Sequence, residues 1–156
     1  MEAVFKEKMA LAGKGLRNLF FPRRCVVCGR FLGADETDFC AACREELPLT
    51  YQWDIVQNAA FEHLARRFEV EAAAALFFFR PESDFRKIIY AIKYGGRKAL
   101  GFRMGQLLGA QLAHSRLFRD VQAVVPVPLH PLRRWKRGYN QAEAIARGVA
   151  AALGLP

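Results

Sequence analysis

Four cysteines in two close pairs constrain this chain more than any other feature. They follow the pattern Cys25-Val-Val-Cys28 and, after eleven further residues, Cys40-Ala-Ala-Cys43. Two residues between cysteines let one tight turn present both sulfurs to one ion, and Gly29 relieves the first turn because glycine adopts positive φ without strain. Four thiolates complete a tetrahedron and leave no position for water. The spacing therefore predicts one structural zinc site.

Other uses of four cysteines are weaker candidates. A redox Cys-x-x-Cys motif usually stands alone, whereas this chain has two. No secretory signal is visible, because Glu2, Glu7 and Lys8 interrupt the N-terminal apolar residues, so we expect a cytoplasmic protein in which disulfides are rare. An iron–sulfur cluster also takes four cysteines and ranks below zinc.

The composition limits the fold and the partners. A chain of 156 residues that is 53% hydrophobic can form one ordinary domain with a small appendage, and global disorder is not expected. The longest apolar run, residues 72–79, is far shorter than the roughly 18 residues of a membrane span. The net charge of +9 indicates an anionic partner: nucleic acid, a phosphorylated small molecule or a membrane surface.

Hydrophobic periodicity predicts several helices. They are expected over residues 4–20, around 59–68, over 84–94, over 99–115, and after Asn140. Gly95-Gly96 is expected to end the helix over residues 84–94. Asn140 is predicted to be the N-cap of the last helix, with Glu143 three residues later as in a capping box.

Two apolar runs are candidate strands. Residues 121–127 are almost continuously apolar, which is typical of a strand buried in a parallel sheet, and Pro126 and Pro128 close the run. Residues 72–79 fit a buried strand or part of a helix, and the phenylalanines at 77–79 favour a strand. The strand-loop-helix order predicts an α/β fold over residues 51–156, after an N-terminal helix and zinc-binding segment over residues 1–50.

The strongest candidate for an anion site is a basic loop over residues 130–139. Its cations are Arg133, Arg134, Lys136 and Arg137. They precede the predicted helix start at Asn140, where free N–H groups and the positive end of the helix dipole favour anions. The loop also follows the predicted strand, and open α/β sheets bind ligands at that end. A solvated basic loop is an equally weighted alternative. Trp135 and Tyr139 could stack on a base, although such rings more often pack on the domain surface.

A second basic segment begins at Lys93 and continues as Tyr94-Gly95-Gly96-Arg97-Lys98. Glycines with cations suit phosphate, so Lys93 joins the candidate anion site. The spacing fits neither a P-loop nor a dinucleotide-binding motif. The favoured alternative is an ordinary helix C-terminus, where cations complement the dipole and glycine ends the helix.

Three segments together resemble one family. They are the cysteines after Phe-Pro-Arg-Arg, the segment Ile-Lys93-Tyr94-Gly-Gly-Arg97, and Val125-Pro-Val-Pro-Leu-His-Pro-Leu-Arg-Arg-Trp-Lys-Arg-Gly-Tyr-Asn-Gln-Ala-Glu143. This pattern resembles the ComF family of competence-associated phosphoribosyltransferase-like proteins, which includes ComFC and GntX. The resemblance spans nearly the whole chain, and the last segment is the specific one.

The resemblance implies a zinc-binding segment followed by a type I phosphoribosyltransferase fold, with helices flanking a parallel sheet. Such folds bind 5-phosphoribosyl-1-pyrophosphate with Mg²⁺ and transfer its phosphoribosyl group. By this resemblance the loop from His130 to Asn140 lies near the pyrophosphate. The family is also linked to the handling of imported single-stranded DNA in natural transformation, so proteins of the competence machinery are expected partners.

The chain departs from the family pattern at its end. It stops at Pro156, before the expected strand with two adjacent acids and the small-residue loop that grips the ribose phosphate. The resemblance therefore predicts a partial fold that needs the missing part to bind Mg²⁺ with the phosphoribosyl donor, and that exposes apolar surface suited to self-association. No catalytic residue is assigned, and catalysis itself stays open. The alternatives are a non-catalytic protein that handles single-stranded DNA and a zinc-stapled interaction module.

Overall fold

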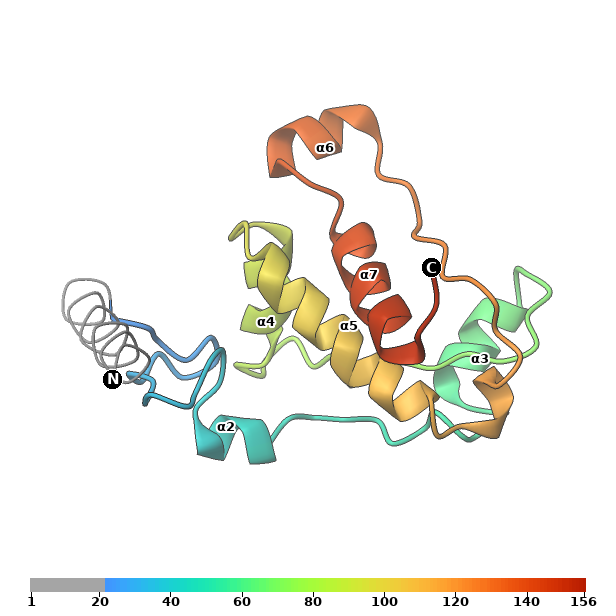
Figure 1. The fold of residues 1–156 in the computed structure, drawn as a ribbon, viewed down its shortest axis with the longest axis horizontal. Helices are drawn as coiled ribbons and strands as arrows, with labels where there is room; N and C mark the ends of the chain where they lie inside the picture. The colour runs from blue at the N-terminus through green and yellow to red at the C-terminus, as the bar shows by residue number, and fades with distance from the viewer. Residues whose placement is uncertain (1–21) are drawn as a thin grey trace, which may run out of the picture. The chain divides into compact units, whose positions relative to one another are not determined.

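The computed structural model describes residues 22–156, and the chain divides into two compact units, Met1–Glu46 and Leu47–Pro156 (Figure 1). The helix predicted over residues 4–20 lies outside the described residues.

The first unit is built around the two cysteine pairs. Arg24 and Phe31 form an isolated antiparallel bridge, and the Cys25 N–H donates to the Arg30 carbonyl at 2.8 Å. Gly29 takes φ +75° in the turn between them, as its position in the sequence predicts. Helix α2, Ala41–Glu45, has Cys40 as its N-cap residue. One cysteine pair thus lies on a tight turn and the other at the start of a short helix.

The second unit is helical. It contains α3 (Ala59–Ala65), α4 (Arg86–Lys93), α5 (Lys98–Leu112), a short 3-10 helix η1 (Arg116–Phe118), α6 (Pro131–Arg137) and α7 (Gln141–Leu153). The helices predicted around 59–68, over 84–94, over 99–115 and after Asn140 are confirmed. Helix α4 buries Ile88 and Ile92, and Gly96 ends its C-terminal turn at φ +64°.

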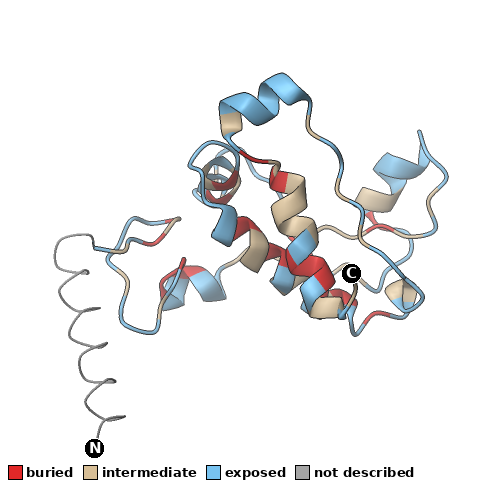
Figure 2. Cartoon of the chain, turned by 45° about the horizontal axis from the view of Figure 1, so that its top comes forward, coloured by how far each residue is buried: buried red, intermediate tan, exposed pale blue. Residues whose placement is uncertain are grey.

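The core of the second unit is the contact between α5 and α7, where small residues let the two backbones meet. A Cβ added at Gly105 would lie 2.1 Å from the Ile145 carbonyl oxygen, and one added at Gly148 would lie 2.0 Å from the Phe102 oxygen. Further along, Gly109 lies against Val149 and Ala152. The contacts advance in the same direction on both helices, so α5 and α7 run parallel with their N-terminal ends together. Buried residues gather along this pair (Figure 2).

The predicted parallel sheet is wrong. Within residues 22–156 the pairing of extended chain is limited to two isolated bridges, Arg24 with Phe31 and Leu49 with Phe77. Residues 121–127 form no regular secondary structure and mostly face solvent, with Val125 85% and Val127 75% exposed. A strand is stabilised by the neighbouring strands of its sheet, and an apolar run does not by itself supply a neighbouring strand. The α/β assignment, and with it the partial phosphoribosyltransferase fold, is replaced by a helical unit.

The run at residues 72–79 is not a strand either. Phe77 forms its single bridge to Leu49, while Ala73 and Leu76 are buried as part of an irregular segment. The phenylalanines at 77–79 give this segment a high β-propensity, but no partner strand lies beside it in the described residues. Such short apolar runs are intrinsically ambiguous between secondary-structure types.

The basic segment predicted as a loop is also different, because residues 131–137 form helix α6. His130 Nδ1 accepts a hydrogen bond from the Leu132 N–H at 3.3 Å, Pro131 occupies the first turn, and Gly138 follows the last residue at φ +74°. Proline at the start and glycine just past the end are the ordinary boundaries of a helix. The side chains of α6 are largely exposed (Figure 2). No helix in residues 22–156 is both long and apolar enough to cross a bilayer.

Candidate metal centre and basic cavity

The four cysteine sulfurs converge as a zinc site requires. The Sγ atoms of Cys25, Cys28, Cys40 and Cys43 all lie within 4.8 Å of one another, and the Cys28 and Cys40 sulfurs are 3.7 Å apart. A tetrahedron with Zn–S bonds of about 2.3 Å has sulfur–sulfur edges of about 3.8 Å. A disulfide would need about 2.05 Å, and all four cysteines are free thiols. The donor set and its spacing therefore fit Zn²⁺.

The electrostatics of the cluster also suit a divalent cation. Burial acts to raise the pKa of Cys25, but hydrogen bonds from the backbone N–H groups of Cys28, Cys40 and Val27 outweigh it and lower that pKa to about 6. Burial and hydrogen bonds with the neighbouring thiols raise the pKa of Cys43. Four thiolates at this spacing repel one another, and a central divalent charge offsets that repulsion.

The loop between the two cysteine pairs is held by hydrogen bonds made by two charged side chains, Glu36 and Arg23. The Glu36 carboxylate accepts hydrogen bonds from the Gly33 N–H at 2.8 Å and the Ala41 N–H at 2.7 Å, which lower the pKa of Glu36. The Arg23 guanidinium donates to the Glu36 and Gly33 carbonyls, each at 2.9 Å. These hydrogen bonds fix the path of the chain between the two cysteine pairs and thereby help to orient the metal-binding sulfurs.

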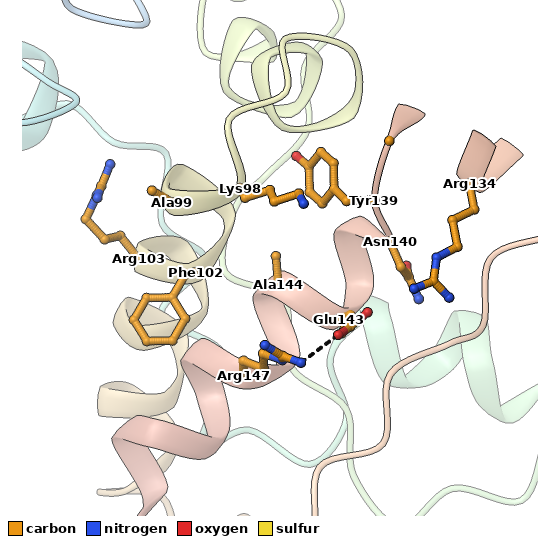
Figure 3. A pocket seen from close by; sticks show the side chains of 11 residues that line it. Lys98, Ala99, Phe102, Arg103, Arg134, Tyr139, Asn140, Glu143, Ala144 and Arg147 are labelled. Atoms are coloured by element: carbon orange, nitrogen blue, oxygen red, sulfur yellow. Dashed lines mark ion pairs between the residues drawn. The ribbon is translucent and has the colours of Figure 1, made fainter. Parts of the chain in front are cut away.

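In the second unit, a basic cavity lies at the paired N-terminal ends of α5 and α7 (Figure 3). Its volume is about 450 Å³. Its cationic lining residues are Lys98, Arg103, Arg134 and Arg147. Lys98 Nζ lies 5.2 Å from the centroid of the Tyr139 ring, and Arg134 extends toward Asn140 and Glu143. Glu143, the single acid among the described lining residues, pairs with Arg147 at 2.9 Å, so the cavity is positive overall.

Helix termini add to this positive potential. Asn140 Oδ1 accepts from the Ala142 N–H at 3.1 Å, which confirms the predicted N-cap of α7. Glu143 turns to Arg147 instead of completing a capping box. Helix α5 begins at Lys98 without a side-chain cap. Because the N-terminal end of each helix dipole is positive, both helices favour an anion at this end.

The structure brings together some of the predicted anion-binding residues and not others. Arg134 and Asn140 line the cavity, whereas Arg133, Lys136 and Lys93 do not. Arg137 lies outside it as well, with its Cζ 5.2 Å from the Tyr94 ring centroid. The alternative interpretation of the second basic segment as a helix end is confirmed, since α4 ends at Lys93.

Three cations of the cavity were missed as site residues: Lys98, Arg103 and Arg147. The sequence carries a signal that could have found them. Small residues recur at every fourth position on both helices, at Gly101, Gly105 and Gly109 in α5 and at Ala144, Gly148 and Ala152 in α7. Such spacing favours close helix packing, which places the two helix starts and their cations side by side.

Comparisons with known proteins agree with the metal centre. A family model described as a double zinc ribbon domain matches residues 16–53, which include all four cysteines. The whole sequence has four cysteines and the matched segment has no histidine, so these residues supply one Cys₄ site.

The chain is also similar to Competence protein F of Haemophilus influenzae (strain ATCC 51907 / DSM 11121 / KW20 / Rd). The two are 43% identical over 35 residues, which cover 22% of this chain and 15% of that protein. No solved structure matches the chain. The two similarities support the resemblance to the ComF family and a zinc ribbon at the N-terminal end.

Proposed function

We propose that this protein binds the phosphate groups of a nucleic acid strand at the basic cavity, and that it serves DNA uptake in natural competence. The observation that carries the proposal is the convergence of Lys98, Arg134 and Arg147 with the N-terminal ends of α5 and α7 on one cavity. Phosphate is recognised by such combinations of cations and free backbone N–H groups.

A polymeric ligand explains the positive charge beyond the cavity. Helix α6 adds Arg133 and Lys136 next to Arg134 and contains no acid. The net charge of the chain is +9. A strand can contact both the cavity and α6, and each phosphate it places near a cation releases counterions. The similarity to Competence protein F is the basis for assigning the strand to DNA uptake.

The zinc ribbon has a structural role in this proposal. Cys25, Cys28, Cys40 and Cys43 would hold the ion, and the four-sulfur set leaves no open position for substrate. Among residues 22–46 the buried apolar side chains besides the cysteines are Val27 and Phe39. The metal supplies the cross-link that so small a core cannot.

A small phosphorylated molecule is the second candidate ligand, with 5-phosphoribosyl-1-pyrophosphate as the form that the ComF resemblance implies. The cavity volume of about 450 Å³ supports it, since small-molecule sites are usually about 300–1,000 Å³. Phosphoribosyl transfer would also need acids to manage Mg²⁺ and the ribose hydroxyls. Glu143, the acid among the described lining residues, is already paired with Arg147. Binding is therefore proposed here, and transfer is not.

The test is the affinity for a fluorescent single-stranded oligonucleotide measured at several salt concentrations. The wild type should show a logarithmic affinity that falls linearly with the logarithm of salt. The double variant Lys98→Glu/Arg134→Glu should lose at least about tenfold in affinity at low salt, and its slope should fall by about 1.4 for two lost phosphate contacts. Arg66→Glu/Arg67→Glu is the charge-matched control, because these exposed cations follow α3 and do not line the cavity.

Two outcomes separate the candidates. Equal affinity in both double variants would contradict a role for the cavity, since charge alone would then account for binding. Displacement of the strand by micromolar 5-phosphoribosyl-1-pyrophosphate with Mg²⁺ would favour the small ligand at the same cavity. Failure of the small molecule to compete would favour the strand.

A further inference from the structure

Three flat side chains form an exposed column beside the basic cavity. The Tyr90 and Tyr94 rings are stacked, with centroids 5.9 Å apart and planes at 29°. The Arg137 Cζ atom lies 5.2 Å from the Tyr94 centroid. Tyr90 is 52% and Tyr94 67% exposed, so a large part of each side chain is open to solvent.

The core does not require these two rings. Helix α4 buries Ile88 and Ile92, while Tyr90 within it and Tyr94, the C-cap residue that follows it, stay largely exposed. Tyr139 shows the contrasting case, because it is buried and its hydroxyl donates to the Ile92 carbonyl. Two neighbouring exposed aromatic rings next to a guanidinium are a common means of holding another flat, electron-rich group.

The column is continuous with the cavity. Arg137 Nη1 donates to Gln141 Oε1 at 3.2 Å, which fixes the guanidinium near the start of α7. The next residues, Gly138 and Tyr139, line the cavity, and Lys98 lies over the Tyr139 ring. Arg137 therefore contacts Tyr94 and is followed in the chain by two residues that line the cavity.

We infer that Tyr90, Tyr94 and Arg137 form a stacking surface for the unpaired bases of the strand whose phosphates the cavity holds. This inference rests on the proposed function, since the cavity cations hold the phosphates of the same strand. Bases in a duplex are already stacked and paired, whereas unpaired bases expose both faces. Stacking on an aromatic side chain strengthens binding by about 5- to 160-fold per base and tolerates any sequence.

The experiment compares two 15-nucleotide strands of equal charge, one with bases and one with abasic tetrahydrofuran sugars throughout. The wild type should bind the strand with bases at least about fivefold more tightly than the abasic strand. The variant Tyr90→Ala/Tyr94→Ala should bind both strands alike, with its affinity for the abasic strand and for a duplex unchanged. Tyr90→Phe/Tyr94→Phe keeps the rings and should keep the wild-type preference.

Tyr51→Ala is the matched control for losing an exposed ring. Tyr51 is 66% exposed, and its ring centroid lies 5.2 Å from that of Trp53. The next residue in the chain is the acid Asp54, whereas the proposed stacking surface has the guanidinium of Arg137. This variant should retain the preference for bases. Circular dichroism of each variant checks that the helices are intact.

Each result decides something different. Equal wild-type affinity for the strand with bases and the abasic strand would overturn the stacking surface and leave the phosphate cavity standing, and this comparison needs no variant. Equal losses on both strands in the alanine variant would also overturn it. Binding of neither strand by the wild type at low salt would overturn the proposed function as well.

Discussion

At the scale of single residues, Tyr139 shows how one side chain joins three helices of the second unit. It lies between α6 and α7, it is buried, and its hydroxyl donates to the carbonyl of Ile92 in α4. Burial raises the pKa of the Tyr139 phenol, because the charged phenolate is poorly solvated there. The sequence left open whether this ring stacks on a base or packs on the domain. The structure shows that it packs.

Replacing Tyr139 by Phe should destabilise the second unit by about 1–2 kcal/mol at pH 7, because the buried Ile92 carbonyl loses its donor. Urea unfolding followed by circular dichroism measures this. The folded pKa of Tyr139 is raised above its ordinary value of about 10, so the stabilisation is fully present below pH 10 and is lost as the pH rises through the folded pKa. The difference between wild type and Phe variant should therefore shrink above pH 10.

The matched control for this prediction is Tyr90→Phe, which removes an exposed hydroxyl and should leave the stability unchanged. A difference between Tyr139→Phe and wild type that stays constant from pH 9 to 12 would show that Tyr139 has the same pKa in the folded and unfolded states, which would contradict the raised pKa of the buried phenol. No difference at pH 7 would show that the bond contributes nothing.

At the scale of elements, the α5–α7 pair depends on glycine at particular positions. Gly105→Ala should destabilise the second unit by about 1–3 kcal/mol, because its Cβ would overlap the Ile145 carbonyl oxygen at 2.1 Å. Gly101→Ala, one turn earlier in the same helix, meets its nearest atoms at 3.5 Å. It should be neutral or should stabilise the helix by up to about 1 kcal/mol, since alanine loses less entropy than glycine.

The free energy of unfolding from urea titration distinguishes the two glycine variants, which differ by one methyl group on one helix face. Similar values for both would mean that α5 and α7 do not pack as closely as the structure shows. Stabilisation by Gly105→Ala would contradict the parallel backbone contact directly.

At the scale of the whole molecule, the two units should respond differently to metal removal. The first unit is organised by its four cysteines, and the second by helix packing. We expect one zinc per chain by elemental analysis, and none after Cys28→Ser or treatment with a strong chelator. Loss of the metal should unfold residues 22–46 and leave the helices of residues 47–156 formed.

Limited proteolysis with mass spectrometry tests this division. Without zinc, cleavage should fall in the cysteine-rich unit and release a stable fragment that begins near Leu47. Added zinc should restore protection to chelated wild type but not to Cys28→Ser. Rapid digestion of the entire chain on chelation would show that the second unit depends on the metal.

What the sequence could predict follows from the range of each interaction. The Cys₄ cluster, the N-cap at Asn140 and the helix break at Gly95-Gly96 are local patterns, and the structure has each of them. The expected sheet failed because a strand depends on remote partners, and Val125 and Val127 have none in the described residues. Helix α6 was missed although Pro131 and Gly138 mark its limits.

The candidate site was only partly predictable for the same reason. Arg134 and Asn140 are close in sequence and were expected to act together. Lys98 and Arg147 belong to different helices, and only the packing of α5 on α7 brings them to one cavity. Charge density along the chain pointed to α6 and not to the starts of α5 and α7, whose cations line the cavity.

If an anion binds at the basic cavity as proposed, the parallel direction of α5 and α7 should couple its binding to folding. Side by side, two parallel helices place like poles together, and the contacts at Gly105 and Gly148 hold them there against this repulsion. An anion between the positive poles relieves the repulsion, and a ligand that binds the folded state alone adds RT ln(1 + [L]/Kd) to its stability. This coupling is reciprocal. A change that spreads the helices apart should weaken the binding of the ligand, and bound ligand should raise the temperature at which the helices separate.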